Sequence, residues 1–467
     1  MRRTKIIATI GPKTESEESI KRLAEAGMNI ARINMSHGNP AWNSIIMKRI
    51  RNIGEQTTFP IGLMIDTQGP EIRTSAKTEF GLEEGDIFKI AVSSACDIQE
   101  GEKHTFVNYE NLINKVKRHD IIMIDNGLIA LEVLRLKPHH ITCKVLNKGK
   151  LGERKSVNIP GIKIDLPSVT EKDIQDLKLG VENSMDYVAQ SFVRKREDVE
   201  QMRGILNRLG SNAMIIAKIE DQEGINNMDE IIDEADGIMV ARGDLGVEIP
   251  FEEIPIVQKK IVKKCIERGK PVIIATHLLE SMIQNPRPTR AEVTDIANAV
   301  FEKADCIMLS GETTKGDYPV ECVKTMHSIA KNIQNKLIFD AQSNGLKTKN
   351  VKEAITLGAC INAENLDAKA IIVFSKTGKL LRLVTKNRPN IDIFVFTDNE
   401  EVRRKLMIYW SAFPFMIKFN DGFESIVNNA VDILQAKKLL AKEDRIIIVS
   451  DINPHKNVDI LEIREID

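Results

Sequence analysis

Eight short runs of aliphatic and β-branched residues alternate with amphipathic windows along most of this chain, and no other feature constrains its fold as strongly. The runs are predicted strands at residues 5–10, 29–34, 62–66, 186–190, 215–219, 237–241, 272–276 and 306–310. Helices are predicted between and after them at residues 17–26, 41–54, 171–179, 197–209, 225–234, 256–268 and 291–303, with another after Pro319. Gly27, Gly210 and Gly269 follow predicted helices and are typical stop signals. Eight strand–helix units in this order predict an α/β fold, a closed (β/α)8 TIM barrel.

Polar residues follow nearly every one of these predicted strands. In such a barrel the active site lies at the C-terminal ends of the strands, and a rim that served packing alone would not need polar groups there. The sequence therefore predicts a catalytic mouth. Its candidate residues are Gly11 and Pro12, Asn34 and Ser36, Asp66 and Thr67, Ser191, Lys218 and Glu220, Arg242 and Asp244, Thr276 and His277, and Ser310 and Glu312.

Charge is densest after the strands predicted at 215–219 and 237–241. The first delivers Lys218 and Glu220, and the second delivers Arg242 and Asp244 on a turn flanked by glycines. Pairs of this kind also occur as surface salt bridges. Here two carboxylates, a lysine and an arginine converge on one mouth, which favours a divalent-metal site that serves an anionic, phosphorylated substrate.

The barrel pattern is interrupted between about Pro70 and Pro167. Short strands punctuated by glycine, without helical periodicity, predict a small all-β domain inserted in a strand-to-helix loop of the barrel. An insertion at the mouth can act as a lid that excludes water and adds cations, for which Arg73, Arg154 and Lys155 are candidates. For Arg154 and Lys155 the alternative is a solvated hairpin tip, and their spacing alone favours it.

A polar stretch at residues 340–350 predicts a linker, and a different pattern follows it. Apolar runs at 368–375, 391–397 and 445–450 alternate with helical windows, which is typical of an open α/β domain. The turn of Ser375, Lys376, Thr377, Gly378 and Lys379 follows a strand and opens a helix, so it could present backbone N–H groups to an anionic effector. The predicted domains are the barrel at 1–69 and 168–339, the inserted domain at 70–167, and a C-terminal domain for effector and subunit contacts at 340–467.

Composition limits the classes of partner. A formal net charge of -1 gives no reason to expect nucleic acid or a membrane surface as a partner. We find neither a signal peptide nor a run of about 18 apolar residues that could span a membrane. The six cysteines lack C-x-x-C spacing and are typical of reduced core thiols. These features predict a cytoplasmic protein.

Several separated segments resemble the pyruvate kinase family. They are RINMSHG from Arg32, DTQGPEIRT from Asp66, VNIPGIKIDLPSVTEKDIQDL, IAKIEDQEG, GIMVARGDLGVEIP, THLLESM from Thr276, and PRPTRAEVTDIANAVFEKADCIMLSGETTKGDYP. These segments span the barrel and both boundaries of the insertion. The resemblance is weaker in the C-terminal domain, where KTGKLLRLVTKNRPN and residues 406–410 are similar but the last strand pair departs.

The resemblance implies phosphoryl transfer between phosphoenolpyruvate and ADP, giving pyruvate and ATP, in a homotetramer that uses Mg²⁺ or Mn²⁺ and K⁺. It assigns Mg²⁺ to Glu220 and Asp244, and K⁺ to Asn34, Ser36, Asp66 and Thr67. It assigns substrate contacts to Arg32, Lys218, Gly243, Asp244 and Thr276, and nucleotide contacts to Arg32, Asn34, His37, Arg73 and Lys155.

The chemistry of the transfer agrees with these assignments. A migrating phosphoryl group spreads negative charge over its oxygens, so catalysis needs cations, which Lys218, Arg73, Arg32 and the metals supply. The enolate left behind needs a proton, for which Thr276 and Ser310 are candidates, although such hydroxyls often bond only to backbone. For His37, a hydrogen-bonded loop histidine is the alternative to a nucleotide contact.

Three positions depart from the family pattern or bear on cation dependence. Members commonly carry Lys where this chain has Gln68 and Gln where it has His277. Glu at the position of Glu71 accompanies dependence on a monovalent cation, whereas Gln68 is often found in the independent group. A carboxylate beside two anionic substrates needs a compensating cation. The presence of Glu71 therefore predicts that activity depends on K⁺.

The tail at residues 448–460 replaces a Gly-rich loop that helps to clasp sugar-phosphate effectors in regulated members. The resemblance therefore predicts weak or no activation by fructose 1,6-bisphosphate. Two other functions stay open from sequence: a Mg²⁺-dependent enolate-forming lyase on the same barrel, and a catalytically silent regulatory paralogue. The cations of the insertion argue against the lyase, and the intact Arg32, Lys218, Glu220, Asp244 and Thr276 argue against the silent paralogue.

Overall fold

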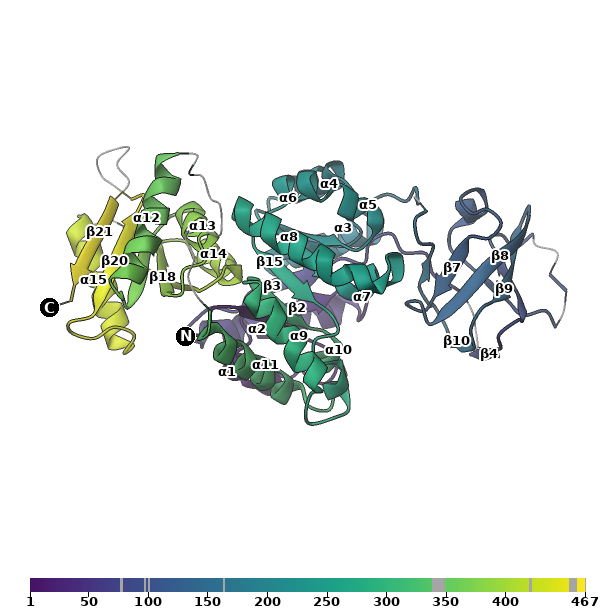
Figure 1. Ribbon diagram of the computed structural model, residues 1–467, viewed down its shortest axis with the longest axis horizontal. Coiled ribbons are helices and arrows are strands. Elements are labelled where there is room, and N and C mark those ends of the chain that lie inside the picture. Colours follow the sequence, from purple (N-terminus) through teal and green to yellow (C-terminus); the bar gives the residue numbers. More distant parts are fainter. Residues whose placement is uncertain are drawn as a thin grey trace.

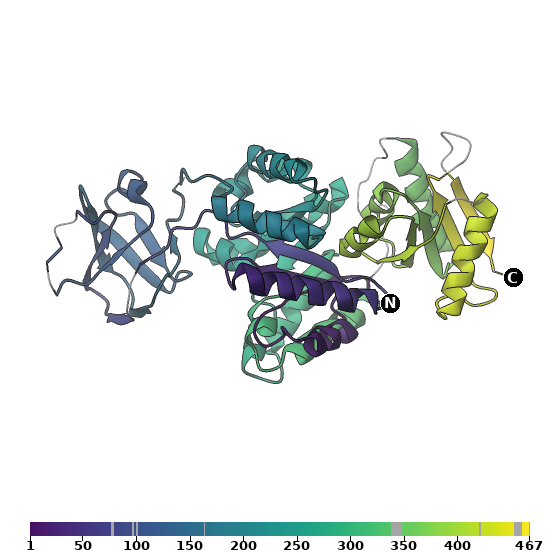
Figure 2. The ribbon, with the colours of Figure 1, turned by 180° about the vertical axis from the view of Figure 1, so that it is seen from behind.

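The computed structural model describes residues 1–75, 79–95, 98–99, 101–162, 164–337, 348, 350–419, 422–452 and 460–466. A barrel occupies the centre, a domain of strands lies at one end, and an α/β domain lies at the other (Figure 1). The same order is seen from behind (Figure 2). Within the described residues, no helix is long and apolar enough to cross a membrane.

Eight parallel strands close the barrel, which confirms the predicted fold class. The strands are β1 (Lys5–Thr9), β2 (Ile30–Asn34), β3 (Gly62–Asp66), β12 (Tyr187–Gln190), β13 (Met214–Ile219), β14 (Gly237–Ala241), β15 (Val272–Ala275) and β16 (Cys306–Leu309). Their order around the barrel is β1-β16-β15-β14-β13-β12-β3-β2. Each predicted strand is confirmed to within one residue at either end, because short buried β-branched runs leave little freedom of register.

The helices that cover the barrel also follow the prediction. They are α1 (Glu17–Ala26), α2 (Pro40–Glu55), α3 (Glu171–Glu182), α4 (Arg196–Arg208), α5 (Gln222–Asn226), α6 (Met228–Glu234), α8 (Ile254–Arg268), α9 (Arg290–Phe301) and α11 (Pro319–Gln334). The window predicted at 225–234 is divided into α5 and α6. Ser16, Thr170 and Thr289 cap α1, α3 and α9 by accepting hydrogen bonds from backbone N–H groups.

Short helical segments that periodicity did not reveal lie at the mouth and in the loops. They are α7 (Arg242–Glu248), η2 (Phe251–Glu253), η3 (Glu280–Ile283) and α10 (Gly311–Thr314). The segment predicted as a turn flanked by glycines is therefore a helix, and this prediction was wrong. A helix of seven residues is too short for an apolar period to be seen among its charged residues.

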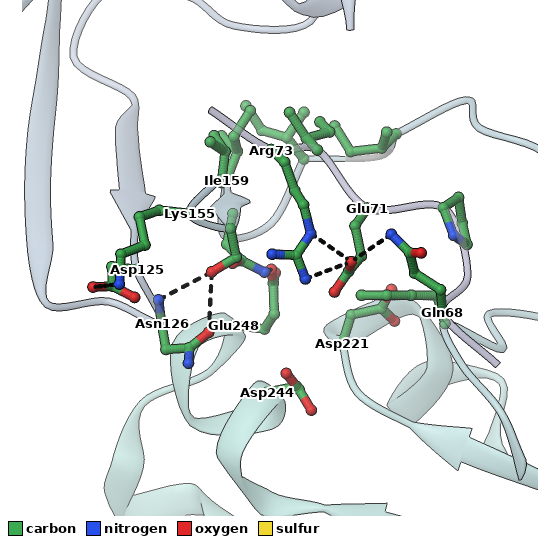
Figure 3. A pocket seen from close by; sticks show the side chains of 18 of the residues that line it. Gln68, Glu71, Arg73, Asp125, Asn126, Lys155, Ile159, Asp221, Asp244 and Glu248 are labelled. Atoms are coloured by element: carbon green, nitrogen blue, oxygen red, sulfur yellow. Dashed lines mark hydrogen bonds and ion pairs between the residues drawn. The ribbon is translucent and has the colours of Figure 1, made fainter. Parts of the chain in front are cut away.

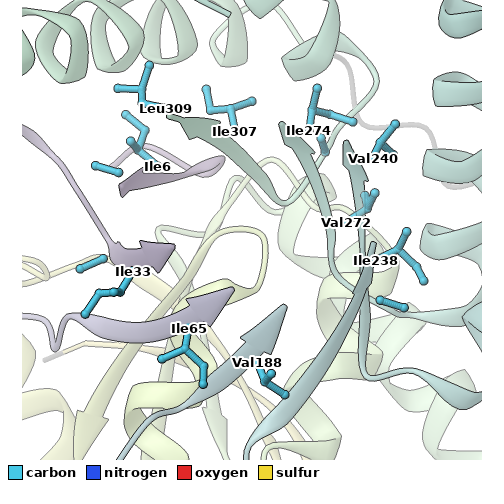
Figure 4. Close-up of a cluster of buried hydrophobic side chains, with 14 of the residues drawn as sticks. Ile6, Ile33, Ile65, Val188, Ile238, Val240, Val272, Ile274, Ile307 and Leu309 are labelled. Carbon is cyan, nitrogen blue, oxygen red and sulfur yellow. The ribbon is translucent and has the colours of Figure 1, made fainter. Parts of the chain in front are cut away.

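Alternate side chains of the barrel strands enter two different cores. One set, including Ile6, Ile65 and Val240, packs between the strands and the surrounding helices (Figure 4). The other set, including Ile7 and Met239, fills the barrel interior. The interior is therefore a packed core rather than a pore, and chemistry is confined to the strand ends.

The inserted domain has a core and sheets of its own. Its strands are β4 (Phe80–Leu82), β5 (Ile87–Ala91), β6 (His104–Phe106), β7 (Ile121–Ile124), β8 (Ile129–Lys137), β9 (His140–Val145), β10 (Gly149–Leu151) and β11 (Val157–Asn158), with η1 (Glu110–Asn114) between β6 and β7. Six strands pair in the order β11-β7-β8-β9-β5-β6, and β10 pairs with β4. The predicted all-β character is confirmed, while the boundaries at 70 and 167 stay predictions.

The C-terminal domain contains a sheet of order β19-β18-β17-β20-β21. The predicted runs form β17 (Ala370–Phe374), β18 (Asp392–Thr397) and β20 (Arg445–Ser450), whereas β19 (Ala412–Met416) and the antiparallel β21 (Ile460–Glu465) were not predicted. Its helices are α12 (Val351–Asn365), α13 (Lys379–Lys386), α14 (Glu400–Lys405), η4 (Leu406–Ile408) and α15 (Phe423–Ala436). Nearly all of the predicted linker at 340–350 lies outside the described residues.

The closed bottom of the barrel is sealed by the C-terminal domain. Leu406, Met407 and Ile408 belong to the same apolar cluster as the residues of the barrel interior. Arg388 and Asp305 form a buried ion pair across the junction, with Nη1 and Oδ1 2.9 Å apart. The five described cysteines are free and buried, as predicted, and Cys96 lies outside the described residues.

Candidate active site at the barrel mouth

A buried cluster of opposite charges lies at the ends of β2, β3 and β13. The Lys218 ammonium nitrogen lies 2.8 Å from Glu220 Oε1 and 3.1 Å from Asp66 Oδ1. The other oxygen of Asp66 accepts a hydrogen bond of 2.7 Å from Arg32 Nε. Ser191 Oγ lies 2.7 Å from the Lys218 ammonium nitrogen. Parallel strands place these side chains at one rim, as the sequence predicted.

The charges in this cluster depend on one another. Burial opposes the charge of Lys218, but Asp66 and Glu220 outweigh it and raise the pKa of the ammonium. Burial likewise opposes the charge of Asp66, and Arg32 and Lys218 hold its pKa below the usual value. Burial also acts to raise the pKa of Glu220, and the Lys218 ammonium opposes this by favouring the carboxylate. The cluster therefore presents a fixed ammonium and two buried carboxylates.

Gly243 and Thr276 meet across the ends of β14 and β15. The Gly243 N–H donates to Thr276 Oγ1 at 2.8 Å, and the Thr276 hydroxyl donates to the Ala275 carbonyl at 2.6 Å. The φ angles of Thr276 and His277 are 67° and 55°, in the left-handed region. A β-branched residue is rare in this region, and such strain occurs at functional sites. Sequence reasoning had no signal for it.

Arg242 does not join the mouth, contrary to the prediction. Its Nη1 pairs with Asp295 at 2.7 Å, and its Nη2 donates to the Thr276 carbonyl at 2.6 Å. The guanidinium therefore braces the end of β15 against α9. Asp244, two residues further along α7, projects towards the cavity described next (Figure 3).

A cavity of about 800 Å³ lies between the barrel mouth and the inserted domain (Figure 3). Among the predicted site residues, those that line it are Ser36, His37, Arg73, Arg154, Lys155 and Asp244. The cavity lining does not include Lys218, Glu220, Gly243 or Thr276. Asp244 lines the cavity and lies on α7 beside Gly243, which joins Thr276. Phe192 also lines the cavity, and its N–H donates to Glu220, so the broad space adjoins the compact charged cluster at the end of β12.

Arg73, Glu71 and Gln68 form a connected group on the wall of this cavity. Glu71 Oε2 lies 2.7 Å from both Nε and Nη2 of Arg73, and Gln68 Nε2 donates to the same oxygen at 3.2 Å. Arg73 Nη1 also donates to the Arg154 carbonyl at 2.7 Å. The predicted negative charge of Glu71 is therefore partly offset by Arg73.

Lys155 lies on the wall of the cavity and not on a purely solvated hairpin tip. Its ammonium nitrogen lies 2.8 Å from Asp125 Oδ2, and its side chain is 34% exposed. Across the same space, burial lowers the pKa of His37, and Arg73 and Arg32 lower it further. His37 is therefore neutral at physiological pH, so it is suited to hydrogen bonding and carries no charge of its own.

The four residues assigned to K⁺ lie at the ends of two neighbouring strands. Asn34 of β2 pairs in register with Asp66 of β3. Asn34 Oδ1 accepts the Ser36 N–H at 3.0 Å, which folds the chain back over the strand end. Thr67 follows Asp66 and is 3% exposed. All four residues offer oxygen donors, so the set fits a hard cation.

Several residues of the site were missed or given no role. Ser191 was identified only as a strand end. The Phe192 N–H, which donates to Glu220 Oε2 at 2.7 Å, could not be predicted because it depends on a backbone φ of 54°. Asn158 Nδ2 donates to Glu248 Oε1 at 2.9 Å and joins the inserted domain to α7. This pair comes from segments about 90 residues apart, and a single sequence carries no sign of it.

The predicted effector turn lies between β17 and α13, as expected. Gly378 has a φ of 77°, a conformation that favours glycine. Ser375 is buried, and its hydroxyl has no hydrogen-bond partner among the described residues. Lys379 begins the helix, and the Lys376 ammonium nitrogen lies 6.0 Å from the ring centre of Phe419. Residues 453–459 of the altered tail lie outside the described part of the chain.

Comparisons with known proteins agree along nearly the whole chain. Residues 1–323 match the model of "Pyruvate kinase, barrel domain", and residues 353–463 match that of "Pyruvate kinase, alpha/beta domain". A pyruvate kinase of Clostridium acetobutylicum is 40% identical over 458 residues, which cover 97% of this chain and 96% of the relative. Those of Dictyostelium discoideum and Sporosarcina psychrophila are each 42% identical, covering 96% and 97% of this chain and 91% and 78% of the relatives.

Proposed function

This chain belongs to the pyruvate kinase family, and we propose that its barrel mouth carries out the family's reaction with the residues described above. The enzyme transfers the phosphoryl group of phosphoenolpyruvate to ADP and forms pyruvate and ATP. The relatives named above give no support to an enolate-forming lyase or a silent paralogue. The observation that carries the assignment of the site is the Lys218 ammonium held between the carboxylates of Asp66 and Glu220.

Lys218, Arg32, Arg73 and Thr276 are the proposed catalytic residues. A transferring phosphoryl group gains little from covalent help, so fixed positive charge and precise placement lower its barrier. Lys218 and Arg32 supply that charge from the buried cluster, where water does not screen it. Gly243 and Thr276 offer polar groups at the neighbouring ends of β14 and β15, where they would contact phosphoenolpyruvate together with Asp244.

The nucleotide is proposed to bind in the 800 Å³ cavity. His37 lies at its barrel side, while Arg73 and Lys155 extend from the inserted domain. Asn34, which is also proposed to contact the nucleotide, ends β2 two residues before Ser36 of the lining. A diphosphate would replace Glu71 and Asp125 as partner of Arg73 and Lys155, because both cations line the cavity. The inserted domain would then bring positive charge to the site only when the nucleotide is bound.

Glu220 and Asp244 are the residues that would hold Mg²⁺ or Mn²⁺. Their carboxylate oxygens are hard donors, and two protein carboxylates with substrate oxygens make a suitable Mg²⁺ site. When bound, the divalent cation would polarise the phosphoryl oxygens. Asn34, Ser36, Asp66 and Thr67 would hold K⁺, and Asp66 would share its charge between that cation, Arg32 and Lys218.

The proton that converts the enolate to pyruvate is proposed to pass through Thr276 or Ser310. The Thr276 hydroxyl donates to the Ala275 carbonyl and accepts from Gly243 N–H, so it must exchange one partner before it can act.

The remaining proposals concern the whole molecule. They are the stated domain boundaries, a homotetramer, a cytoplasmic location, and an effector site for a phosphorylated ligand at Ser375 to Lys379.

One assay separates this function from the lyase and the silent paralogue. Purified protein is given phosphoenolpyruvate with Mg²⁺ and K⁺, and pyruvate is followed through a coupled dehydrogenase. We expect pyruvate only when ADP is present, with one ATP formed for each pyruvate. Pyruvate formation without ADP, or none under either condition, would contradict the proposed function.

A further inference from the structure

We propose that Ser191 is a positioning residue for phosphoryl transfer. Its hydroxyl donates to the Thr67 carbonyl and accepts from the Lys218 ammonium group, and so it holds the ammonium group in place. Ser191 follows β12 and is 3% exposed. Its side chain touches both the proposed catalytic lysine and a residue of the proposed K⁺ site. This inference rests on the proposed role of Lys218 in catalysis.

The direction of the hydrogen bonds around Ser191 follows from distances. Its hydroxyl lies 2.6 Å from the Thr67 carbonyl oxygen and 3.3 Å from Asp66 Oδ1. A hydroxyl has one proton to donate, and the nearer acceptor takes it. The oxygen lone pairs are then left for the Lys218 ammonium at 2.7 Å. Ser191 therefore accepts from Lys218 and is itself held by Thr67.

All three N–H groups of Lys218 are in use. Their acceptors are Ser191 Oγ, Glu220 Oε1 and Asp66 Oδ1, at 2.7, 2.8 and 3.1 Å. A contact with the phosphoryl group therefore requires one of these bonds to be given up. Glu220 and Asp66 both have a second task, as proposed ligands of Mg²⁺ and K⁺, whereas Ser191 has none. Ser191 therefore keeps one N–H group of Lys218 fixed while another is directed to the substrate.

The neighbouring residue holds the other member of the ion pair. The Phe192 N–H donates to Glu220 Oε2 at 2.7 Å, so the end of β12 orients both Lys218 and Glu220. This corner lies close to Gly69, where a Cβ atom would come within 2.8 Å of Phe192 Cδ2 and 3.0 Å of Ser191 Cβ. Gly69 also has a φ of 70°, so any larger residue would strain and displace the corner.

A double-mutant cycle tests whether Ser191 acts through Lys218. The variants are Ser191→Ala, Lys218→Met and the double variant, with kcat measured at saturating substrates, Mg²⁺ and K⁺. We expect Ser191→Ala to lower kcat by about tenfold or more in the wild-type background and by less than about twofold in the Lys218→Met background. Calorimetry should show the Kd of phosphoenolpyruvate within about threefold of wild type, because the hydroxyl acts through Lys218, whose contact with the phosphoryl group is made mainly in the transition state.

A matched control removes a buried hydroxyl elsewhere. Ser168 is 6% exposed, and its hydroxyl donates to Gln201 Oε1 at 2.8 Å, so Ser168→Ala loses a similar bond and should keep kcat within about twofold. The positioning role would be overturned if Ser191→Ala lowered kcat by the same factor in the wild-type and Lys218→Met backgrounds, or if Ser191→Ala alone left kcat unchanged. Neither result would contradict the proposed function. Near-normal turnover of Lys218→Met would instead overturn the catalytic role of Lys218, and only the absence of ADP-dependent pyruvate formation by the wild-type protein would overturn the proposed function. If Ser191→Ala does not fold, Ser191→Cys is judged by the same criterion, since its sulfur is a weak acceptor.

Discussion

Glu71 Oε2 lies 2.7 Å from the guanidinium of Arg73, on the segment that leaves the barrel after β3. The pair changes how the K⁺ requirement is understood. In the structure, Arg73 offsets the charge of Glu71. If Arg73 turns to the nucleotide phosphates, the carboxylate needs another cation beside two anionic substrates.

We therefore predict that replacing K⁺ by a bulky organic cation at constant ionic strength lowers activity by about tenfold or more. Glu71→Lys should partly relieve this dependence, because its ammonium supplies the missing charge within the protein. Initial rates in the two salts, for both proteins, provide the measurement. Equal wild-type rates would show that Gln68, not Glu71, indicates the cation dependence.

The second prediction concerns Asp244, which is proposed to hold Mg²⁺ from α7. Asp244→Asn removes a charged oxygen donor and should cost several kcal/mol of transition-state stabilisation, or about a hundredfold or more in kcat/KM. Asp229→Asn is a useful control, since this exposed carboxylate on α6 pairs with Lys264 and Arg268 on α8 and its loss should leave kcat/KM within about twofold. Near-normal turnover of Asp244→Asn at saturating Mg²⁺ would remove Asp244 from the metal site.

The third prediction concerns the effector turn. Ser375 to Lys379 precede and open α13, where backbone N–H groups could face an anion, but the tail that would complete a sugar-phosphate clasp is altered. Fructose 1,6-bisphosphate should therefore change the half-saturating phosphoenolpyruvate concentration little. Titration of this sugar at sub-saturating substrate checks the prediction. A decrease of several-fold in half-saturation would refute it, and a phosphorylated effector of another kind is compatible with it.

The fourth prediction uses Lys5, a fully buried lysine at the start of β1. Its ammonium nitrogen lies 3.9 Å from the ring centre of Phe413 and donates to the Ala412 carbonyl, which joins the barrel to the C-terminal domain. Burial and the nearby charge of Arg2 together lower the pKa of Lys5 to about 7. An unfolded lysine keeps its proton up to about pH 10.4, so between these values the unfolded state binds more protons.

Since the unfolded state binds more protons in that window, the free energy of unfolding should rise with pH by up to about 1.4 kcal/mol per unit. Lys5→Met has no such group and should show a flatter dependence. Thermal unfolding of both proteins at pH 7, 8 and 9 measures the difference between their melting temperatures. If the melting temperatures of the wild type and Lys5→Met change in parallel with pH, Lys5 remains charged in the folded protein.

The barrel strands could be predicted from sequence because each is a short buried run bounded by turn or charged residues. Lys218 and Glu220 could be identified because β13 ends in charge, and a barrel exposes its strand ends on one side. In the same way, the apolar runs that became β17, β18 and β20 were recognised without knowledge of their neighbours. These predictions depend on local pattern, which the fold preserves.

The parts that could not be predicted depend on distant contacts or backbone angles. Arg242 was expected at the mouth because of its position after a strand, but Asp295 on α9 draws it into the barrel wall. The left-handed φ angles of Phe192 and Thr276 have no glycine to mark them. The contact between Asn158 and Glu248 joins two segments that are separate in the sequence. Each of these features arises only when the chain is folded.

The central claim is that the ammonium of Lys218 acts on the transferring phosphoryl group. Its most direct test is the steady-state kinetics of Lys218→Met at saturating Mg²⁺ and K⁺. We predict that kcat falls by orders of magnitude while the KM for phosphoenolpyruvate stays within a few-fold, because the contact is made mainly in the transition state. A large rise in KM with unchanged kcat would contradict this account and make Lys218 a residue that only binds substrate.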